Sequence, residues 1–482
     1  MNRSIGRLYI VLAAGFALLG LFLGYWQVVA APDLADRNDN RQAAERDKTI
    51  DRGEIVTADK IVLARSVPKR VAGQTTYVRG YPQGTLAPHV VGYANPQVGS
   101  TGVESSYNSY LRGNYGAEPL LVRLRLRTAH GANVELTLNK RVQQIADEQL
   151  IGRAGAVVAI EPKTGKVLAM TSSPGFDLSK VANPAEFAKI RNSSDSVLLN
   201  RATQGRYAPG STFKVVTLVG ALDSNLDYTP ATRFDDTGTL ATNGPPIRNF
   251  GGEVFGDHDL TTALTHSVNT TFARIGQNLG GARMGETMDA FGFGKKPPID
   301  LPAGEVVASG RYGTNNALLP NIEDGADLAR IAIGQEKLSV TPLQMAMVVS
   351  AIANGCTLMR PYLVNRATDQ SGSAVFEQGP RRLTQVCSPD TAREVTDMMG
   401  NVVREGTGTQ AALQGLDVAG KTGTAETGAN GLNDAWFIGF APKDDPKVAV
   451  AVVVERTPET GGVAAAPIAR EVMKAAIARS AG

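Results

Sequence analysis

A serine and a lysine three residues apart, Ser211 and Lys214, have the side chains needed for nucleophilic catalysis. They follow the turn-forming pair Pro209-Gly210, and apolar residues recur at helical spacing from Thr212 to Leu222. We therefore predict that Ser211 begins a helix and that Lys214 lies one turn later on the same face. A neutral lysine could accept the hydroxyl proton as the serine attacks an acyl carbon, provided that burial and a second cation lower the lysine pKa. The pair predicts acyl transfer through a serine ester.

Two further short patterns follow in chain order, Ser267-Val268-Asn269 and Lys421-Thr422-Gly423. The second lies in a β-like run that continues through Thr424-Ala425, and its small residues allow the backbone of a ligand to approach closely. Each pattern is individually common, and the chain contains an earlier copy of all three: Ser66-Val67-Pro68-Lys69, Ser106-Tyr107-Asn108 and Lys163-Thr164-Gly165.

Sequence context separates the two sets. The earlier serine, Ser66, follows a predicted strand, has Pro68 between it and the lysine, and no convincing helix follows to place Lys69 over it. The earlier Lys-Thr-Gly follows Pro162 at the tip of a predicted hairpin, where its side chains face solvent. Only the later set has a helix, a loop and a strand in the required places. The segment Gly406-Thr407-Gly408-Thr409, which precedes the predicted strand of Lys421, is predicted to be a flexible loop.

Composition excludes other classes of function. The 482 residues carry 49 Lys and Arg against 46 Asp and Glu, a net charge of only +3, and no basic run interleaved with aromatic residues, so nucleic-acid binding is not expected. The four histidines are scattered, and neither they nor the two cysteines have the spacing of a zinc site. We expect no metal and no cofactor.

The N-terminus predicts a membrane anchor. Leu8 to Trp26 carries no charge, Gln27 to Ala31 extends the segment, and Arg3 and Arg7 precede it. Residues 1–31 are therefore predicted to form a short cytoplasmic tail and a single transmembrane helix, with the body outside the cytoplasm. The alternative is a signal peptide cleaved after Val29-Ala30-Ala31, although the apolar run is longer than most signal cores.

The remaining chain divides into two predicted domains. Residues 32–133 begin with a polar stalk as far as Asp47 and continue as a small mixed α+β domain. That domain opens with a hairpin from Asp51 to Ala64, followed by β-like pieces at His89–Tyr93 and Gly102–Asn108. Cys356 and Cys387, in the second domain, could form a disulfide outside the cytoplasm or could be two separate buried thiols; both alternatives remain open.

Residues 134–482 are predicted to form an α/β domain around one antiparallel five-stranded sheet. Two apolar strands, Ala156–Ile160 and Val167–Met170, come before a large helical insertion, and three come after it. The cleft is expected between the sheet and the insertion. The other predicted elements are helices at 142–150, 261–279, 283–291, 342–353 and 467–479, and strands at 418–424, 435–441 and 448–455.

Longer blocks surround these patterns. They are Tyr207–Lys214, Gly334-Gln335, Thr341–Ala346, Gly420–Glu426, Ala435–Pro442, Arg52-Gly53 and Leu111–Gly113. Patterns and blocks together resemble the class B penicillin-binding proteins, the peptidoglycan D,D-transpeptidases, and among them the actinobacterial type linked to growth and division. The resemblance spans nearly the whole chain. It implies a transpeptidase domain similar to serine β-lactamases, preceded by a small pedestal domain and one transmembrane helix.

The resemblance also implies catalytic roles. Ser211 would be the nucleophile and Lys214 its proton acceptor. Ser267 would relay a proton to the leaving amine, and Asn269 would hold the peptide of the substrate. Lys421 would supply positive potential.

Substrate binding is assigned in the same way. Thr422 and Thr424 would hold the terminal carboxylate of the substrate, with Gly423 between them in the binding strand. The backbone N–H groups of Ser211 and Thr424 would form the oxyanion hole.

The implied reaction is attack on the D-Ala-D-Ala bond of a peptidoglycan stem peptide, release of D-alanine and transfer of the acyl group to an amine on a neighbouring stem. β-Lactams would acylate the same serine. The N-terminal domain is too short for a glycosyltransferase that polymerises the lipid-linked glycan. The resemblance therefore implies a SEDS-type membrane glycosyltransferase as partner, contacted through Leu8 to Ala31 and the pedestal.

Two alternatives remain. In a D,D-carboxypeptidase or β-lactamase, water would replace the acceptor amine, but no Glu-x-x-Leu-Asn block of the class A hydrolases is found to activate it. A non-catalytic β-lactam sensor or division scaffold is disfavoured by the intact set of three patterns and by the absence of a cytoplasmic signalling domain.

Overall fold

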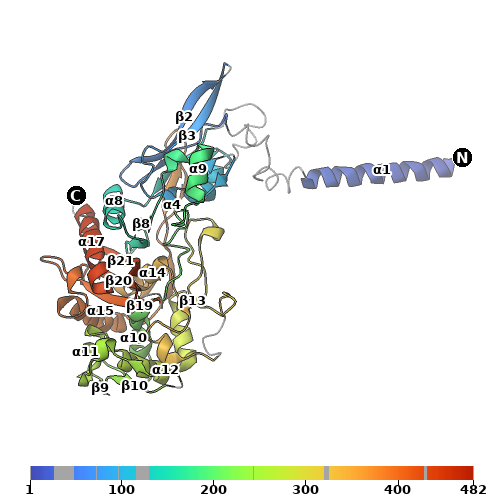
Figure 1. Cartoon of the computed structure of the whole chain (residues 1–482). Helices are drawn as coiled ribbons and strands as arrows, with labels where there is room; N and C mark the ends of the chain where they lie inside the picture. Colours follow the sequence, from blue (N-terminus) through green and yellow to red (C-terminus); the bar gives the residue numbers. More distant parts are fainter. Residues whose placement is uncertain are drawn as a thin grey trace.

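The computed structural model describes residues 2–26, 48–71, 73–95, 97–115, 130–242, 244–319, 325–427 and 431–480. The predicted stalk at 32–47, the extension of the apolar segment through Ala31 and the alternative cleavage site lie outside the described residues. In the body of the molecule, Figure 1 shows the hairpin of β2 (Val62–Val71) and β3 (Gln74–Gly80) at one end. The helices α11 (Leu260–Thr265) and α12 (Asn269–Ala290) lie at the other end, and the strands β19 to β21, within residues 419–457, lie between them.

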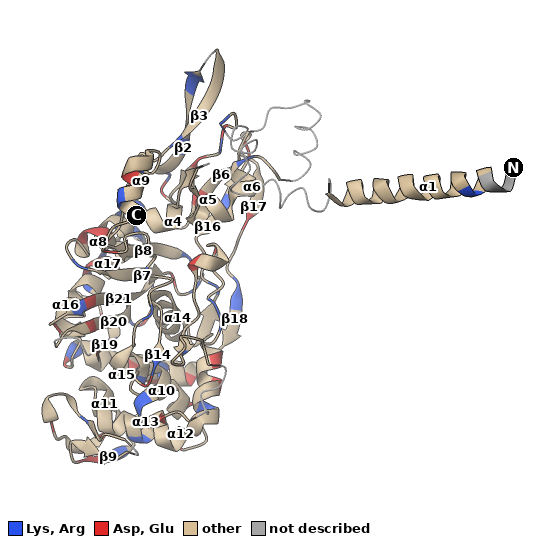
Figure 2. Ribbon diagram, turned by 45° about the vertical axis from the view of Figure 1, so that its right-hand side comes forward, with Lys and Arg blue, Asp and Glu red and all other residues tan. Residues whose placement is uncertain are grey.

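An apolar helix occupies the N-terminus. α1 (Asn2–Gly24) contains a segment, Ile5–Gly24, with a mean hydropathy of 2.0 and no buried residue. Figure 2 shows this helix as almost free of charged residues, with one cation near its N-terminal end. Its length and composition are those of a single membrane span, and the predicted N-terminal apolar helix is confirmed.

The N-terminal domain is built on a six-stranded sheet in the order β17-β16-β6-β1-β2-β3. The predicted hairpin is present, since β1 pairs with β2 antiparallel and Ile55 lies opposite Ala64. Two strands from far along the chain, β16 and β17, complete the sheet, which therefore combines segments from both sides of the predicted boundary at residues 133 and 134. The strands are β1 (Ile55–Val56), β2 (Val62–Val71), β3 (Gln74–Gly80), β6 (Asn133–Leu136), β16 (Val364–Thr368) and β17 (Ala374–Glu377).

Two predicted β-like pieces of this domain are wrong. His89–Tyr93 overlaps the helix α4 (Pro88–Val91), and Gly102–Asn108 contains α5 (Gly102–Ser106) and the start of α6 (Asn108–Leu111). These helices of four or five residues are too short to show a helical repeat, and the β-branched valines within them suggested strands. Packing decides their structure, because Val90, Val91 and Val103 are fully buried. The only strands between α4 and α5 are the short β4 (Ala94–Asn95) and β5 (Gly99–Ser100), within residues 92–95 and 97–101.

The second domain contains the predicted five-stranded sheet, and every pairing in it is antiparallel. Its order is β19-β20-β21-β7-β8, so the first two strands of the domain are joined to the last three by the pair β21 and β7, in which Val452 lies opposite Val157. The strands are β7 (Gly155–Ile160), β8 (Val167–Ser173), β19 (Ala419–Glu426), β20 (Asn433–Ala441) and β21 (Val448–Thr457).

Helices cover both faces of this sheet, which explains why its strands are apolar runs without alternation. Side chains alternate between two hydrophobic clusters: in β20, Trp436 and Ile438 belong to one and Phe437 to the other. The first cluster includes α14 (Pro342–Ala353) and α10 (Lys214–Leu222), and the second includes α8 (Lys140–Gln149) and α17 (Ala466–Ser480). α10 packs within the first cluster against α12 (Asn269–Ala290) and α15 (Pro389–Arg404), and this packing fixes the orientation of the helix that begins near Ser211.

The insertion between β8 and β19 contains more helix than strand. The prediction of one helix from Thr261 to Leu279 is wrong, because the chain leaves the helical conformation at Ser267. The apolar repeat continues across this break and so conceals it. The helices of the insertion other than α10 and α14 are α9 (Pro184–Arg191), α11 (Leu260–Thr265), α12 (Asn269–Ala290), α13 (Leu328–Ile331) and α15 (Pro389–Arg404). Besides β16 and β17, its short strands are β9 (Arg233–Asp236), β10 (Thr239–Leu240), β11 (Ile247–Arg248), β12 (Gly256–Asp259), β13 (Gly310–Arg311), β14 (Leu338–Ser339), β15 (Thr357–Met359) and β18 (Arg382–Gln385).

A disulfide joins Cys356 to Cys387 across a sequence separation of 31 residues, which decides between the two alternatives left open by the sequence. Closing a loop of this length restricts the unfolded chain and contributes about 3–4 kcal/mol to the free energy of unfolding. We expect the double variant Cys356→Ser/Cys387→Ser to lose about this amount in urea denaturation followed by tryptophan fluorescence. Each single variant should lose nearly as much, because either substitution removes the bond. Stability equal to that of the wild type would contradict the prediction.

Candidate active site

The predicted start of a helix at Ser211 is present. A 3₁₀ helix, η3 (Gly210–Phe213), leads directly into α10, and residues three apart in a 3₁₀ turn lie above one another. Ser211 is partly exposed and Lys214 is fully buried. Within the part of the chain that the structure describes, the Ser211 hydroxyl has no hydrogen-bond partner, so its oxygen is free to react.

Lys214 is held by the pattern that follows it in the sequence. Its Nζ donates to the carbonyl oxygen of Ser267 (2.6 Å), to Oδ1 of Asn269 (2.7 Å) and to Oγ of Ser267 (3.2 Å). Asn269 is in turn fixed by its Nδ2, which donates to the carbonyl oxygen of Arg248 at 2.8 Å. The structure therefore brings the first two predicted patterns into direct contact.

The third pattern contacts the same hydroxyl. Nζ of Lys421 donates to Oγ of Ser267 (2.9 Å) and to the carbonyl oxygen of Thr422 (3.0 Å), and Lys421 is also fully buried. The Ser267 hydroxyl thus lies between two lysine side chains. Lys421 and Ser267 are 154 residues apart in the sequence, and no local signal predicts their contact.

Burial weakens the charged form of both lysines. It lowers the pKa of Lys214 well below its usual value, and the nearby charge of Lys421 lowers it further. Burial also lowers the pKa of Lys421 to about 7. Among the described residues, neither Nζ lies within ion-pair distance of a carboxylate that would oppose these shifts. This is the environment that a lysine base requires.

A neutral Lys214 fits its surroundings. An uncharged amine has two N–H donors and one lone pair. Two of the three acceptors around Nζ, the Ser267 carbonyl and Asn269 Oδ1, lie at 2.6 and 2.7 Å and can receive these donors. The lone pair then remains free to take a proton from a hydroxyl.

Ser267 is held in an unusual backbone conformation. Its φ is +61°, in the left-handed region that non-glycine residues rarely adopt. This conformation ends α11 and allows α12 to begin at Asn269, so that both the carbonyl and the hydroxyl of Ser267 reach Lys214. Local strain of this kind is tolerated where the surrounding structure demands it, and it is frequent at active sites.

The strand β19 lies at the edge of the sheet, directly beside the helix start. A Cβ atom on Gly423 would lie only 2.9 Å from the carbonyl oxygen of Pro209 and 2.9 Å from Cγ2 of Thr212. Gly423 therefore permits the close approach of the strand to the segment that carries Ser211. On either side of it, the Thr422 hydroxyl contacts the Thr407 hydroxyl at 2.6 Å, and Thr424 Oγ1 accepts from the N–H of Gly461 in α16 (Gly461–Ala464) at 3.2 Å.

Comparison with known proteins identifies this arrangement. The model of the penicillin-binding protein transpeptidase domain matches residues 155–474, and that of the penicillin-binding protein A dimerisation domain matches residues 52–134. The chain belongs to the penicillin-binding protein transpeptidase family. This assignment confirms the predicted family, fold and class of enzyme.

Individual relatives resemble this penicillin-binding transpeptidase along most of its length. The peptidoglycan D,D-transpeptidase PbpA of Mycolicibacterium smegmatis is 35% identical, over 99% of each chain. A structure of penicillin-binding protein A from M. tuberculosis as a ceftriaxone acyl-enzyme complex matches with a TM-score of 0.81 at 31% identity, covering 90% of this chain and 99% of that one. The D,D-transpeptidase domain of a peptidoglycan glycosyltransferase from Eggerthella lenta gives 0.78 at 39% identity, with 90% and 99% covered.

Arg201 and Glu455 support this transpeptidase site and were not predicted, whereas their neighbours Tyr207 and Trp436 lie in the blocks that resemble the family. The Tyr207 hydroxyl and Nε of Arg201 both donate to the carboxylate of Glu455 at the end of β21, and Nε1 of Trp436 donates to the carbonyl oxygen of Ala208. These bonds anchor the segment before Ser211 to the sheet. No pattern of neighbouring residues marks Glu455, because its partners lie about 250 residues earlier in the chain.

The block Gly334-Gln335 is explained by the close contact between the backbones of Gly334 and Gly210. Gly334 has a φ of +78°, and a Cβ atom there would lie 2.0 Å from the carbonyl oxygen of Gly210. The N–H of Gly210 donates to the carbonyl oxygen of Gly334 at 3.1 Å. Any side chain at position 334 would displace the residue next to Ser211.

The earlier copies of the patterns lie elsewhere. Ser66 was predicted to follow a strand but lies within β2, where its hydroxyl donates to the carbonyl oxygen of Arg52. Lys69 is exposed in the same strand. Lys163 lies in the turn between β7 and β8, as predicted, and forms an exposed ion pair with Asp445. The contexts of Ser66 and Lys163 predicted correctly that neither would lie in the cleft.

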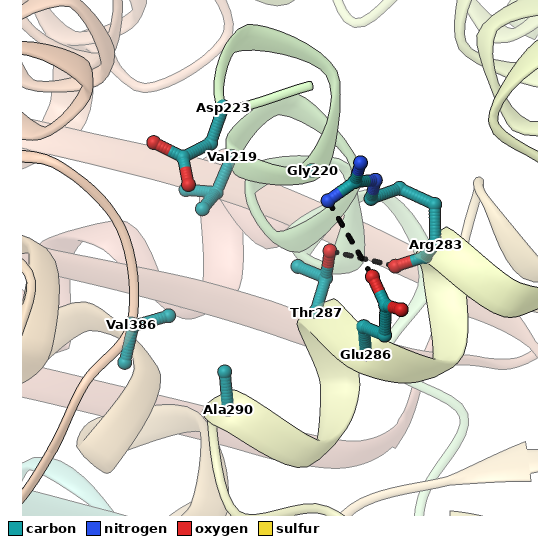
Figure 3. Close-up of a pocket in the computed structure, with 8 residues that line it drawn as sticks. All are labelled: Val219, Gly220, Asp223, Arg283, Glu286, Thr287, Ala290 and Val386. Atoms are coloured by element: carbon teal, nitrogen blue, oxygen red, sulfur yellow. Dashed lines mark hydrogen bonds and ion pairs between the residues drawn. The ribbon is translucent and has the colours of Figure 1, made fainter. Parts of the chain in front are cut away.

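A separate pocket lies at the C-terminal end of α10 (Figure 3). Figure 3 shows an ion pair between Arg283 and Glu286 on one side of it and Val386 on the other. Its lining residues are Val219, Gly220, Asp223, Arg283, Glu286, Thr287, Ala290 and Val386. None of them belongs to the predicted site, so this pocket is distinct from that site.

Proposed function

We propose that this penicillin-binding transpeptidase cross-links peptidoglycan stem peptides through an ester on Ser211. The observation that carries the proposal is the buried Lys214, whose pKa is lowered by burial and by Lys421, three residues from a serine hydroxyl without a partner in the described structure. A nucleophile with a base in reach is the requirement for acyl transfer.

Acylation begins with attack of Ser211 Oγ on the carbonyl carbon of the D-Ala-D-Ala bond. The hydroxyl proton passes to the lone pair of Lys214, and negative charge develops on the former carbonyl oxygen. The backbone N–H groups of Ser211 and Thr424 stabilise this charge. When the C–N bond breaks, Ser267 gives its proton to the leaving amine and is reprotonated from Lys214, to which its oxygen lies at 3.2 Å.

Deacylation reverses these proton transfers. The amine of a neighbouring stem peptide attacks the ester carbon and loses a proton through Ser267 and Lys214, and Ser211 leaves with its proton restored. Asn269 holds the peptide of the substrate. The substrates are stem peptides on the lipid-linked nascent glycan, and β-lactams react with the same serine to form a stable ester.

The terminal carboxylate of the substrate binds along β19. Lys421 contributes positive charge, and the hydroxyls of Thr422 and Thr424 donate to the carboxylate oxygens, with Gly423 allowing the strand to approach the serine. Penicillins also carry a carboxylate and use the same contacts. Charge-assisted hydrogen bonds of this kind are stronger than those between neutral groups.

Intact-mass measurement tests the proposal. The full-length protein in detergent is incubated with benzylpenicillin, and the modified peptide is located by fragmentation. We expect one drug adduct, on Ser211, that is lost slowly. An adduct on another residue would overturn the assignment of the nucleophile, rapid turnover of the drug would favour a hydrolase, and the absence of any adduct would favour a non-catalytic sensor or scaffold.

The same proposal places α1 in the cell membrane as a retained anchor. Its N-terminus would be cytoplasmic and the catalytic domain outside, and α1 with the pedestal would contact a SEDS-type glycosyltransferase that polymerises the glycan. Exchange of residues 1–31 for an unrelated membrane helix should reduce co-purification of the two proteins. Unchanged co-purification and activity would dismiss the contact through α1.

A further inference from the structure

The loop Gly406-Thr407-Gly408-Thr409 was predicted to be flexible, yet it packs closely against the catalytic cleft. A Cβ atom on Gly406 would lie 2.3 Å from the carbonyl oxygen of Thr265, and the N–H of Gly408 donates to the carbonyl oxygen of Val402 at 2.9 Å. Thr265 is the last residue of α11, two positions before Ser267. The loop is therefore fixed to the wall of the cleft that carries Ser267.

The side chain of Thr407 reaches the opposite wall. Its Oγ1 lies 2.6 Å from Oγ1 of Thr422 on β19, and the backbone carbonyl of Thr422 accepts from Lys421. Both the backbone carbonyl and the side-chain hydroxyl of Thr422 are therefore hydrogen-bonded, the carbonyl to Lys421 and the hydroxyl to Thr407. Thr422 is only 6% exposed, whereas Thr407 is exposed.

The direction of this hydrogen bond decides what Thr422 can do. A hydroxyl has one proton to donate and two lone pairs. If Thr407 donates to Thr422, the proton of Thr422 remains free for a carboxylate oxygen, and the lone pairs that would repel that oxygen are partly engaged. An incoming carboxylate favours this direction because it can accept but cannot donate.

We propose that Thr407 is a positioning residue for recognition of the substrate carboxylate: it fixes the rotamer of Thr422 and directs the Thr422 proton toward that group. The inference rests on the proposed role of Thr422. It adds a residue from a loop outside the three patterns and couples the wall that carries Ser267 to the binding strand.

A pair of β-lactams separates positioning from a general structural role. The second-order rate constant of acylation is measured with benzylpenicillin and with its methyl ester, which lacks the negative charge. In Thr407→Val, which preserves shape and removes the hydroxyl, we expect the ratio of the two rate constants to fall about tenfold, mainly through slower reaction of the acid. Thr407→Ser should restore the ratio. Thr409→Val makes the same change two residues later, at a hydroxyl without a hydrogen bond in the described structure, and should leave the ratio unchanged.

A double-mutant cycle gives the second test. If Thr407 acts through Thr422, the double variant Thr407→Val/Thr422→Val should have nearly the same ratio as Thr422→Val alone, because the effects of coupled residues do not add. Additive losses, or an unchanged ratio in Thr407→Val, would overturn this inference. Equal slowing of acid and ester would instead indicate a structural role and would also overturn it. The proposed function fails separately, if the wild type is not acylated at all.

Discussion

Ser211→Ala is expected to abolish acylation by benzylpenicillin and to lower the turnover of stem-peptide substrate by a factor on the order of 10⁶, the scale seen when a serine nucleophile is removed. The ester cannot form without Oγ, and the Ser267 hydroxyl does not take its place because two lysines donate hydrogen bonds to it. Intact mass after incubation with the drug measures the first effect. Release of D-alanine from a donor peptide in the presence of an acceptor amine measures the second.

The duplicated pattern supplies a matched control. Ser66 also precedes a lysine by three residues, but it lies in β2 and donates to a backbone carbonyl. Ser66→Ala should therefore keep the drug adduct. Thermal unfolding of Ser211→Ala should remain close to that of the wild type, because the Ser211 hydroxyl makes no hydrogen bond in the described structure. An adduct on Ser211→Ala, or its loss in Ser66→Ala, would contradict the assignment.

The parts of the site that could be predicted are those that local sequence determines. Ser211 and Lys214 lie one helical turn apart in a segment with helical periodicity, and Lys421 lies in a strand that the β-like run around it predicts. The left-handed backbone of Ser267 could not be predicted, because hydrophobic periodicity continues across the break that it makes. The hydrogen bond between Thr407 and Thr422 joins residues 15 apart in the sequence. It depends on the conformation of the loop between them, which no sequence pattern predicts.

The same distinction applies to the fold. The five-stranded sheet was predictable because buried strands are long apolar runs, such as the one from Ala156 to Ile160. The pedestal was predicted less well. Its short helices, α4 among them, depend on tertiary packing. Its sheet includes β16, which lies about 230 residues after β6 in the sequence. Resemblance to a family supplied the candidate catalytic residues, but it did not indicate which surroundings lower the pKa of Lys214.

Lys214→Met is expected to slow acylation by benzylpenicillin about 10² to 10⁴-fold, the usual contribution of a general base. Methionine has a similar length and no basic nitrogen, so the fold is kept while proton transfer is lost. Lys69→Met, at the corresponding position of the earlier pattern, should react at the rate of the wild type because this lysine is exposed in β2. Normal reactivity of Lys214→Met would exclude this lysine as the base.

The pH dependence identifies the base more directly. In the wild type, protonation of Lys214 removes the lone pair, so the second-order rate constant should fall as the pH drops through its lowered pKa. The rate should also fall as the pH rises above about 7, where Lys421 loses the charge that attracts the carboxylate. In Lys214→Met the acid limb should disappear and the alkaline limb should remain. An acid limb that persists in the variant would assign that titration to a group other than Lys214.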